Sequence, residues 1–325
     1  MTKKRVLSGM RPTGRLHLGH YFGALKNYVA IQDTNECFFM VADWHALTSD
    51  YADTSNIKDN VTDMVIDWLS VGIDPKKAVI FRQSEVAQHS ELFLILSMIT
   101  PLGWLQRCPT YKEQLKEVKN KDLNNYGFLG YPVLMASDIL LYKANEVPVG
   151  EDQLAHLEFS REITRRFNNF YGEVLVEPQA LLTKTARVPG LDKRKMSKSY
   201  GNSILLAETD DDIAKKVRTM YTDPSRIKAT DAGHPDGCVV FAFHEIFNKD
   251  AQTRKQECMN GCVGCVKCKK ELTEMICEFS RPILKKRQEL VNDKKYVEDI
   301  LKEGSLKAGQ VASQTMKEIR QAVKL

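Results

Sequence analysis

The first half of the chain alternates short apolar runs with segments of helical periodicity. Residues 6–10, 37–42 and 78–81 are nearly continuous apolar runs, which is typical of strands buried on both faces of a sheet. Apolar residues in the segment 57–69 recur at the spacing of an amphipathic helix. Strands that alternate with helices of this length predict an α/β fold with a Rossmann-type, doubly wound parallel sheet.

The pattern changes after about Thr183, where a basic loop that contains Pro and Gly leads into mostly helical signals. A length of 325 residues allows one large domain and a smaller one. We therefore predict a Rossmann-type domain at 1–185, a loop and linker at 186–204, and a helical domain at 205–325.

The composition is that of an ordinary globular protein. The formal net charge of +5 permits a polyanionic partner but does not require one. The basic N-terminus has no long apolar run after it, and no stretch approaches the roughly 20 apolar residues needed to cross a bilayer. We expect a cytoplasmic protein without membrane contact, whose cysteines are thiols or metal ligands rather than disulfides.

The first candidate site is the turn after the first strand, which ends in His17-Leu-Gly-His20. Gly14 and Gly19 allow the backbone to approach a ligand where a Cβ atom would clash. The turn leads into a helix N-terminus, whose unpaired N–H groups attract phosphate. The two histidines add donors that could bind a phosphoryl group more tightly in its transition state than in its ground state. Alternatively, they are ordinary turn residues.

The second candidate site is Lys195-Met-Ser-Lys-Ser199, within a basic loop. Two lysines three residues apart, with a small hydroxyl between them and glycines nearby, suit a flexible loop that closes on a polyphosphate. A solvated basic loop is the alternative.

Together, these two motifs are the signatures of class I aminoacyl-tRNA synthetases, and the chain resembles that class over nearly its whole length. The resemblance implies an enzyme that activates an amino acid with ATP and then loads it onto a tRNA. It implies catalytic roles for His17, His20, Lys195 and Lys198, the lysines stabilising charge on the departing pyrophosphate together with Mg²⁺. The resemblance implies no need for a carboxylate base, because the carboxylate of the amino acid itself attacks the α-phosphorus, and positioning and electrostatics supply the rate. The ATP contacts that it implies are Arg11, Pro12, Thr13, Gly19, His20, Asp152, Lys195, Met196, Ser197 and Lys198.

The segment 130–142 indicates which amino acid is bound. On a helix, Met135, Asp138 and Tyr142 share one face, with Tyr131 just before it. An Asp among Met, Ile and Leu is costly to bury unless a group donates to it. An indole N–H is such a donor, whereas phenylalanine would leave Asp138 unpaired. The alternatives are that Asp138 faces solvent or pairs with Lys143.

This segment, together with residues 147–153 and His156, resembles tryptophanyl-tRNA synthetases more than their tyrosine-specific relatives. The resemblance implies that the protein binds L-tryptophan and tRNA(Trp) and forms a homodimer. Asp138 would take the indole nitrogen, Met135 would pack on the ring, and Tyr131 and Gln153 would hold the α-amino group. His45, in the segment 43–47, would lie near the same pocket.

The sequence departs from the family at several positions. Many bacterial members have Gln where this chain has Arg11, Thr where it has His17, and Asn where it has His20. The lysine that contacts ATP after Tyr111 could be Lys112 or Lys116, so neither is assigned. A tyrosyl-tRNA synthetase, a nucleotidylyltransferase and a synthetase-derived RNA-binding regulator remain alternatives.

Five cysteines of the last third form a metal-binding pattern, since four of them fall within eleven residues. Some tryptophanyl-tRNA synthetases carry a [4Fe–4S] cluster on C-x22-C-x6-C-x2-C, and the last two spacings recur here although the first is shorter. The resemblance favours Cys238, Cys258, Cys265 and Cys268 as ligands and Cys262 as a bystander. Zinc on four of the five thiolates, or unligated thiols, are the alternatives.

Overall fold

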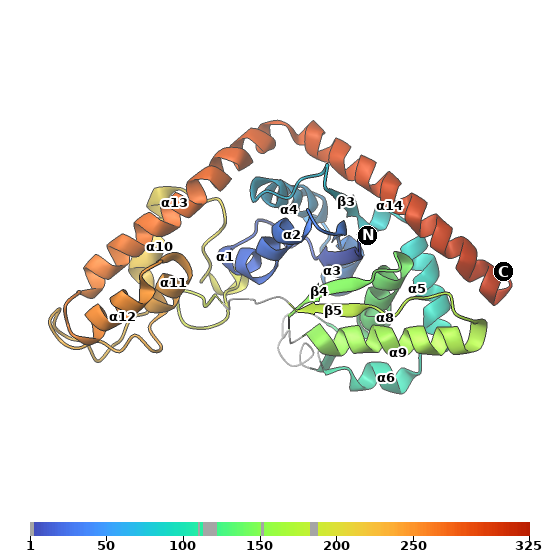
Figure 1. Cartoon of the computed structure of the whole chain (residues 1–325), viewed down its shortest axis with the longest axis horizontal. Helices are drawn as coiled ribbons and strands as arrows, with labels where there is room; N and C mark the ends of the chain where they lie inside the picture. The colour runs from blue at the N-terminus through green and yellow to red at the C-terminus, as the bar shows by residue number, and fades with distance from the viewer. Residues whose placement is uncertain (1–2, 110, 113–121, 151–152, 183–187) are drawn as a thin grey trace. The chain divides into compact units, whose positions relative to one another are not determined.

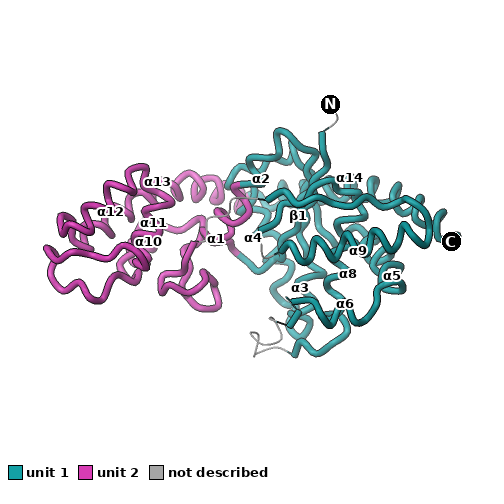
Figure 2. Tube along the Cα trace, turned by 60° about the horizontal axis from the view of Figure 1, so that its bottom comes forward, with its two compact units in different colours: residues 1–14, 27–184, 293–325 teal, residues 15–26, 185–292 magenta. Residues whose placement is uncertain are grey.

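The structure is a computed structural model that describes residues 3–109, 111–112, 122–150, 153–182 and 188–325. Asp152 and Lys116, both named above, lie outside these residues. The described chain forms two compact units, and each is made of segments that are distant in sequence. Unit 1 contains residues 1–14, 27–184 and 293–325, and unit 2 contains residues 15–26 and 185–292 (Figure 2).

Unit 1 is built on a parallel sheet with the strand order β3-β2-β1-β4-β5 (Figure 1). These strands are β1 (Arg5–Met10), β2 (Glu36–Val41), β3 (Ala78–Arg82), β4 (Glu146–Val149) and β5 (Gln179–Leu182). The register aligns Val6 with Cys37 and Cys37 with Ala78. The order runs outward from β1 in both directions, so a crevice opens between the carboxyl ends of β1 and β4. The predicted α/β fold with a parallel sheet is confirmed.

Helices pack around the sheet in unit 1. They are α3 (Asp43–Asp50), α4 (Ile57–Ser70), α5 (Gln88–Ile99), α6 (Leu102–Arg107), α8 (Tyr126–Leu141), α9 (Leu154–Tyr171) and α14 (Lys294–Val323). The predicted periodic residues of α4, including Val61, Met64 and Trp68, are buried. Asn125 begins α8, because its side chain accepts the N–H of Phe128 at 2.9 Å.

The last helix, α14, packs against the edge strand β3. Gly304 makes this approach possible, because a Cβ atom at this position would lie 1.8 Å from the carbonyl oxygen of Ile80. The hydroxyl of the next residue, Ser305, accepts the backbone N–H of Arg82 at 3.3 Å. The helix therefore covers the edge strand and accepts a hydrogen bond from one of its backbone N–H groups.

Unit 2 contains α1 (Leu18–His20), a π-helical turn (Tyr21–Leu25), α10 (Asp210–Thr219), α11 (Val239–Phe247), α12 (Ala251–Met259) and α13 (Cys265–Asn292). Aromatic packing holds residues 15–26 in this unit, since the Phe22 ring centroid lies 5.4 Å from that of Phe247 and 5.8 Å from that of Phe279. The helix α2 (Lys26–Ile31) follows and runs into unit 1.

The two units differ from the predicted contiguous domains at 1–185 and 205–325. Residues 15–26 join the later helices, and residues 293–325 join the sheet. Both differences come from contacts between segments far apart in sequence, which local periodicity does not encode. No described helix is long and apolar enough to cross a membrane.

Candidate functional site

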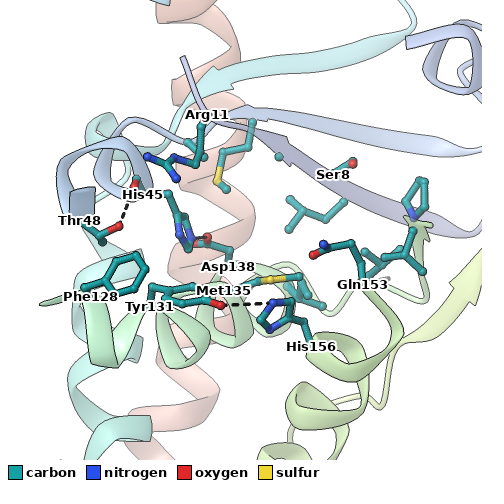
Figure 3. A pocket seen from close by; sticks show the side chains of 18 residues that line it. Ser8, Arg11, His45, Thr48, Phe128, Tyr131, Met135, Asp138, Gln153 and His156 are labelled. Carbon is teal, nitrogen blue, oxygen red and sulfur yellow. Dashed lines mark hydrogen bonds and ion pairs between the residues drawn. The ribbon is translucent and has the colours of Figure 1, made fainter. Parts of the chain in front are cut away.

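A cavity of about 290 Å³ lies in unit 1 where β1, β2 and β4 meet α3, α8 and α9 (Figure 3). Its walls are more apolar than polar, although several polar side chains line it. The cavity is lined by Leu7, Ser8, Gly9, Arg11, Met40, Ala42, His45, Thr48, Phe128, Tyr131, Met135, Asp138, Ile139, Val147, Pro148, Val149, Gln153 and His156. An apolar cavity with a few polar groups at the switch point of a parallel sheet is typical of a small-molecule site.

Asp138 is the buried charge of this cavity, with 2% of its surface exposed. Asp138 therefore does not face solvent. It also does not pair with Lys143, which instead pairs with Glu318. Its Oδ2 accepts from His45 Nε2 at 2.9 Å, and Gln83 Nε2 lies 2.9 and 3.0 Å from its two oxygens. His89 Nδ1 lies 2.6 Å from Oδ1.

These neighbours determine the charge of Asp138. Burial raises the pKa of this carboxyl, but the nearby charges and hydrogen bonds of His89 and His45 outweigh burial and hold the pKa below its usual value. Asp138 is therefore a carboxylate at neutral pH, and it can accept a further hydrogen bond from a ligand.

The sequence analysis missed Gln83 and His89. Gln83 follows β3 directly, in a 3-10 turn (Gln83–Glu85), and His89 lies in the first turn of α5, the next helix; both are fully buried. Polar residues just beyond the carboxyl end of a buried strand were the available signal, since this edge of a parallel sheet is where ligands bind.

The other residues predicted for an amino-acid pocket also line the cavity. Met135 lies on its apolar wall, and Gln153 lies at the start of α9 (Figure 3). The Tyr131 hydroxyl is 3.4 Å from Nε2 of His156, whose Nδ1 lies 3.9 Å from the sulfur of Cys108. The structure thus brings Tyr131, Met135, Asp138, Gln153 and His45 together around one space.

The two motifs that we predicted to bind phosphate come together in unit 2. The backbone N–H of Leu18 donates to the carbonyl of Ile204 at 2.9 Å, and that of Leu206 donates to the carbonyl of Leu16 at 2.9 Å. This pairing aligns the segment of the two histidines with the chain that follows the lysine-containing loop. Lys198 Nζ then donates to the carbonyl of Arg15 at 3.0 Å.

Both histidines of the first motif are uncharged at neutral pH. Burial lowers the pKa of His17 to about 4, with a further contribution from the charge of Lys198. Burial is the main cause that lowers the pKa of His20 to about 3, and the charges of His17, Lys198 and Lys195 contribute to the same lowering. The pair therefore offers neutral N–H donors, while the lysines supply the positive charge.

The side chain of Asn202 holds the loop of the second motif by hydrogen bonds. The side-chain carbonyl of this residue accepts the N–H of Ser197 at 2.8 Å, and its amide donates to the carbonyl of Lys195 at 3.1 Å and to Asp192 at 2.7 Å. Met196 is buried. Of the remaining residues predicted to contact ATP, Gly19 belongs to unit 2, whereas Arg11, Pro12 and Thr13 belong to unit 1.

Four cysteines of unit 2 influence one another electrostatically. Burial raises the pKa of Cys268 to about 12, and although Arg254 opposes this, the thiols of Cys238, Cys258 and Cys265 raise it further. His244 Nε2 lies 3.2 Å from the sulfur of Cys268. Cys262 is exposed, and its sulfur instead lies 3.7 Å from the carbonyl of Asn260. Among the described residues, no three His, Cys, Asp or Glu side chains are arranged to hold a single metal ion.

The chain is similar to known proteins over its whole length. The family model described as tRNA synthetases class I (W and Y) matches residues 2–281. The tryptophan–tRNA ligase of Thermotoga maritima is 48% identical, and that of Aquifex aeolicus is 42% identical; the alignments cover 99% of this chain and 99% and 100% of those relatives.

A solved structure agrees with these relatives. Tryptophanyl-tRNA synthetase from Campylobacter jejuni, complexed with ADP and tryptophan, is 34% identical with a TM-score of 0.88 over 99% of this chain and 100% of that chain. Because a family model spans most of the sequence and full-length relatives match it from end to end, the chain belongs to the class I tRNA synthetases for tryptophan and tyrosine, among the tryptophan–tRNA ligases.

Proposed function

We propose that this protein activates L-tryptophan with ATP and transfers the tryptophanyl group to tRNA(Trp). The observation that carries the proposal is the Asp138 carboxylate, which is buried and charged at the edge of an apolar cavity. The indole ring combines a large apolar surface with one N–H donor and no acceptor, so it matches this cavity. Full-length similarity to tryptophan–tRNA ligases supports the same substrate.

The reaction proceeds in two displacements. A carboxylate oxygen of tryptophan attacks the α-phosphorus of ATP, and the bond from that phosphorus to the bridging oxygen of pyrophosphate breaks. A hydroxyl of the terminal tRNA ribose then attacks the carbonyl of tryptophanyl-AMP, and AMP leaves. Neither displacement forms a covalent bond to the protein, so catalysis depends on positioning and on charge stabilisation.

The motifs of unit 2 suit the first displacement. His17 and His20, which are neutral, donate hydrogen bonds to phosphate oxygens, and Lys195 and Lys198 stabilise the negative charge that accumulates on pyrophosphate. Mg²⁺ carried by the phosphates would neutralise part of the same charge. Further ATP contacts assigned by resemblance are Arg11, Pro12, Thr13, Gly19, Met196, Ser197 and Asp152.

The residues around the cavity would select and orient the amino acid. Asp138 accepts the ring N–H, Met135 packs on the ring, and Tyr131 and Gln153 hold the α-amino group. His45, which lines the cavity and contacts Asp138, completes the wall beside the ring nitrogen.

Pyrophosphate exchange into ATP tests the proposal directly. We expect exchange with tryptophan and much weaker exchange with tyrosine and phenylalanine, followed by charging of tRNA(Trp). Preferential exchange with tyrosine would instead identify a tyrosine enzyme. No exchange with either, combined with retained tRNA binding, would favour an RNA-binding regulator.

We further propose that Cys238, Cys258, Cys265 and Cys268 hold a [4Fe–4S] cluster, with zinc as the alternative. The mutual electrostatic influence of these thiols supports their convergence, whereas Cys262 takes no part in it. Ligand sulfurs of one tetrahedral zinc ion lie about 3.8 Å apart, given Zn–S bonds of about 2.3 Å. A four-iron cluster separates its ligands further. Zinc and a four-iron cluster therefore require different separations of the ligand sulfurs, and the metal content of the protein distinguishes them.

The identity of the metal is tested by chemical analysis of protein purified without oxygen. We expect about four iron and four sulfide per chain, with a broad visible absorbance, as a [4Fe–4S] centre requires. Cys258→Ser should lose the iron, and Cys262→Ser should retain it. One zinc per chain, or equal iron loss in both variants, would contradict the ligand assignment.

We also propose that the protein is a homodimer. Leu94 and Met98 on α5 are 55% and 73% exposed, and Leu102 at the start of α6 is 58% exposed, so large apolar side chains gather on one part of unit 1. Such a patch is typical of an interface. Sedimentation should report a dimer that Met98→Glu dissociates and that Leu306→Glu, at an exposed position of α14, does not. A monomeric wild type would exclude the dimer.

A further inference from the structure

The carboxylate at the edge of the cavity is held from behind by residues that do not line the cavity. Gln83 and His89 are fully buried, and each donates to Asp138. His45 reaches the same carboxylate from the cavity side, at Oδ2. The oxygen Oδ1 is therefore turned into the protein interior, and Oδ2 is the oxygen next to the cavity.

The orientation of the Gln83 amide follows from its other contact. Its side-chain carbonyl accepts the backbone N–H of Trp44 at 3.1 Å. The NH2 group must then face Asp138, where it lies within 3.0 Å of both oxygens. Gln83 is thus a donor to the carboxylate and cannot act as its acceptor.

The direction of the hydrogen bond between His89 and Asp138 follows by similar reasoning. A carboxylate only accepts, so His89 Nδ1, 2.6 Å from Oδ1, carries a hydrogen. His89 Nε2 lies 2.9 Å from the hydroxyl of Tyr142, which is also buried. The imidazole of His89 is therefore held between the hydroxyl of Tyr142 and Oδ1 of Asp138.

We propose that His89 is a positioning residue for amino-acid selection: it fixes Oδ1 of Asp138 so that Oδ2 faces the cavity as a charged acceptor for the ring N–H of the substrate. This inference rests on the proposed function, because it assigns the ring N–H to tryptophan. Without His89, only the Gln83 amide, which is shared between the two oxygens, donates to Oδ1. The carboxylate can then rotate about its χ2 angle or take up a proton, and either change weakens the acceptor.

The consequence is specific to substrates that carry a ring N–H. A purely structural role for His89 would affect every amino acid that fills the cavity to the same degree. If His89 has a positioning role, its loss weakens the activation of tryptophan but does not change the activation of an isosteric analogue whose ring N–H is replaced. The analogue β-(benzothiophen-3-yl)alanine, in which sulfur stands in place of N–H, provides this comparison.

The test compares His89→Leu, which has no donor, with His89→Asn, whose amide can place an N–H where Nδ1 stands. We expect His89→Leu to raise the KM for tryptophan in pyrophosphate exchange about 10- to 100-fold. This is the effect expected from the loss of one or two charge-assisted hydrogen bonds. Turnover should change less than KM. The preference for tryptophan over the analogue should fall by a similar factor, and His89→Asn should restore most of it.

Several results would overturn the inference. Equal losses for tryptophan and the analogue, or a preference that does not change in His89→Leu, would show a structural role only. If His89→Leu does not fold, His89→Phe, which also lacks a donor, takes its place, and an unaltered preference there would overturn the inference equally. A wild type that activates neither compound would refute the proposed function itself, whereas an active wild type isolates the role of His89.

Discussion

Replacing Asp138 with alanine should lower kcat/KM for tryptophan by two orders of magnitude or more in pyrophosphate exchange. The substitution removes the acceptor for the ring N–H, and it leaves the buried donors of His45, Gln83 and His89 without their shared partner. A hydrogen bond to a charged group contributes about 1.5–3 kcal/mol, and unpaired buried donors add to the loss. Steady-state exchange kinetics with tryptophan and phenylalanine measure the effect.

Asp138→Asn serves as the matched variant, because it keeps the shape of the side chain while removing the charge. It should retain the fold and still lose discrimination against phenylalanine. The KM for ATP should change little in either variant, since none of the side chains that bond to Asp138 is predicted to contact ATP. An alanine variant that selects tryptophan as sharply as the wild type would contradict the role of Asp138.

A second large effect is expected at Gly304, where even alanine should destabilise the protein. The added Cβ atom would lie 1.8 Å from the oxygen and 2.7 Å from the carbon of the Ile80 carbonyl, and both are backbone atoms of β3. Because the strand cannot move aside, α14 must shift. We expect a loss of about 1–3 kcal/mol in the free energy of unfolding, the usual cost of overpacking. Urea unfolding at neutral pH measures it.

Gly309 provides the control in the same helix, since a Cβ atom there would meet nothing within 4 Å. Gly309→Ala should stabilise the protein by about 0.5–1 kcal/mol, because alanine favours the helix over glycine. Equal effects at the two positions would show that helix propensity, rather than the contact with Ile80, determines the result.

The fold was predictable where burial leaves a local pattern. The apolar runs of β1, β2 and β3 and the periodic residues of α4 identified a parallel α/β sheet, because strands buried on both faces have few polar residues. The strand β5 was missed: its four residues are Gln-Ala-Leu-Leu, it lies at the edge, and no side chain in it is fully buried.

The candidate site was predictable only from residues with unusual surroundings in sequence. Asp138 stood out because it lies among apolar residues on one helix. Gln83 and His89 did not, because their partner is about 50 positions away and only the packing of α5 against α8 brings them together. Directional hydrogen bonds of this kind follow from tertiary structure and have no local signature.

The return of α14 to the sheet has a consequence for how the protein can be divided. A fragment that ends near residue 185 would contain all five strands, yet β3 would lose the helix that shields Ile80 and binds the N–H of Arg82. Its bare edge could then recruit strands from other molecules. Neither unit can therefore be released by a single cut, and the chain must be synthesised to its last helix before the sheet is protected from self-association.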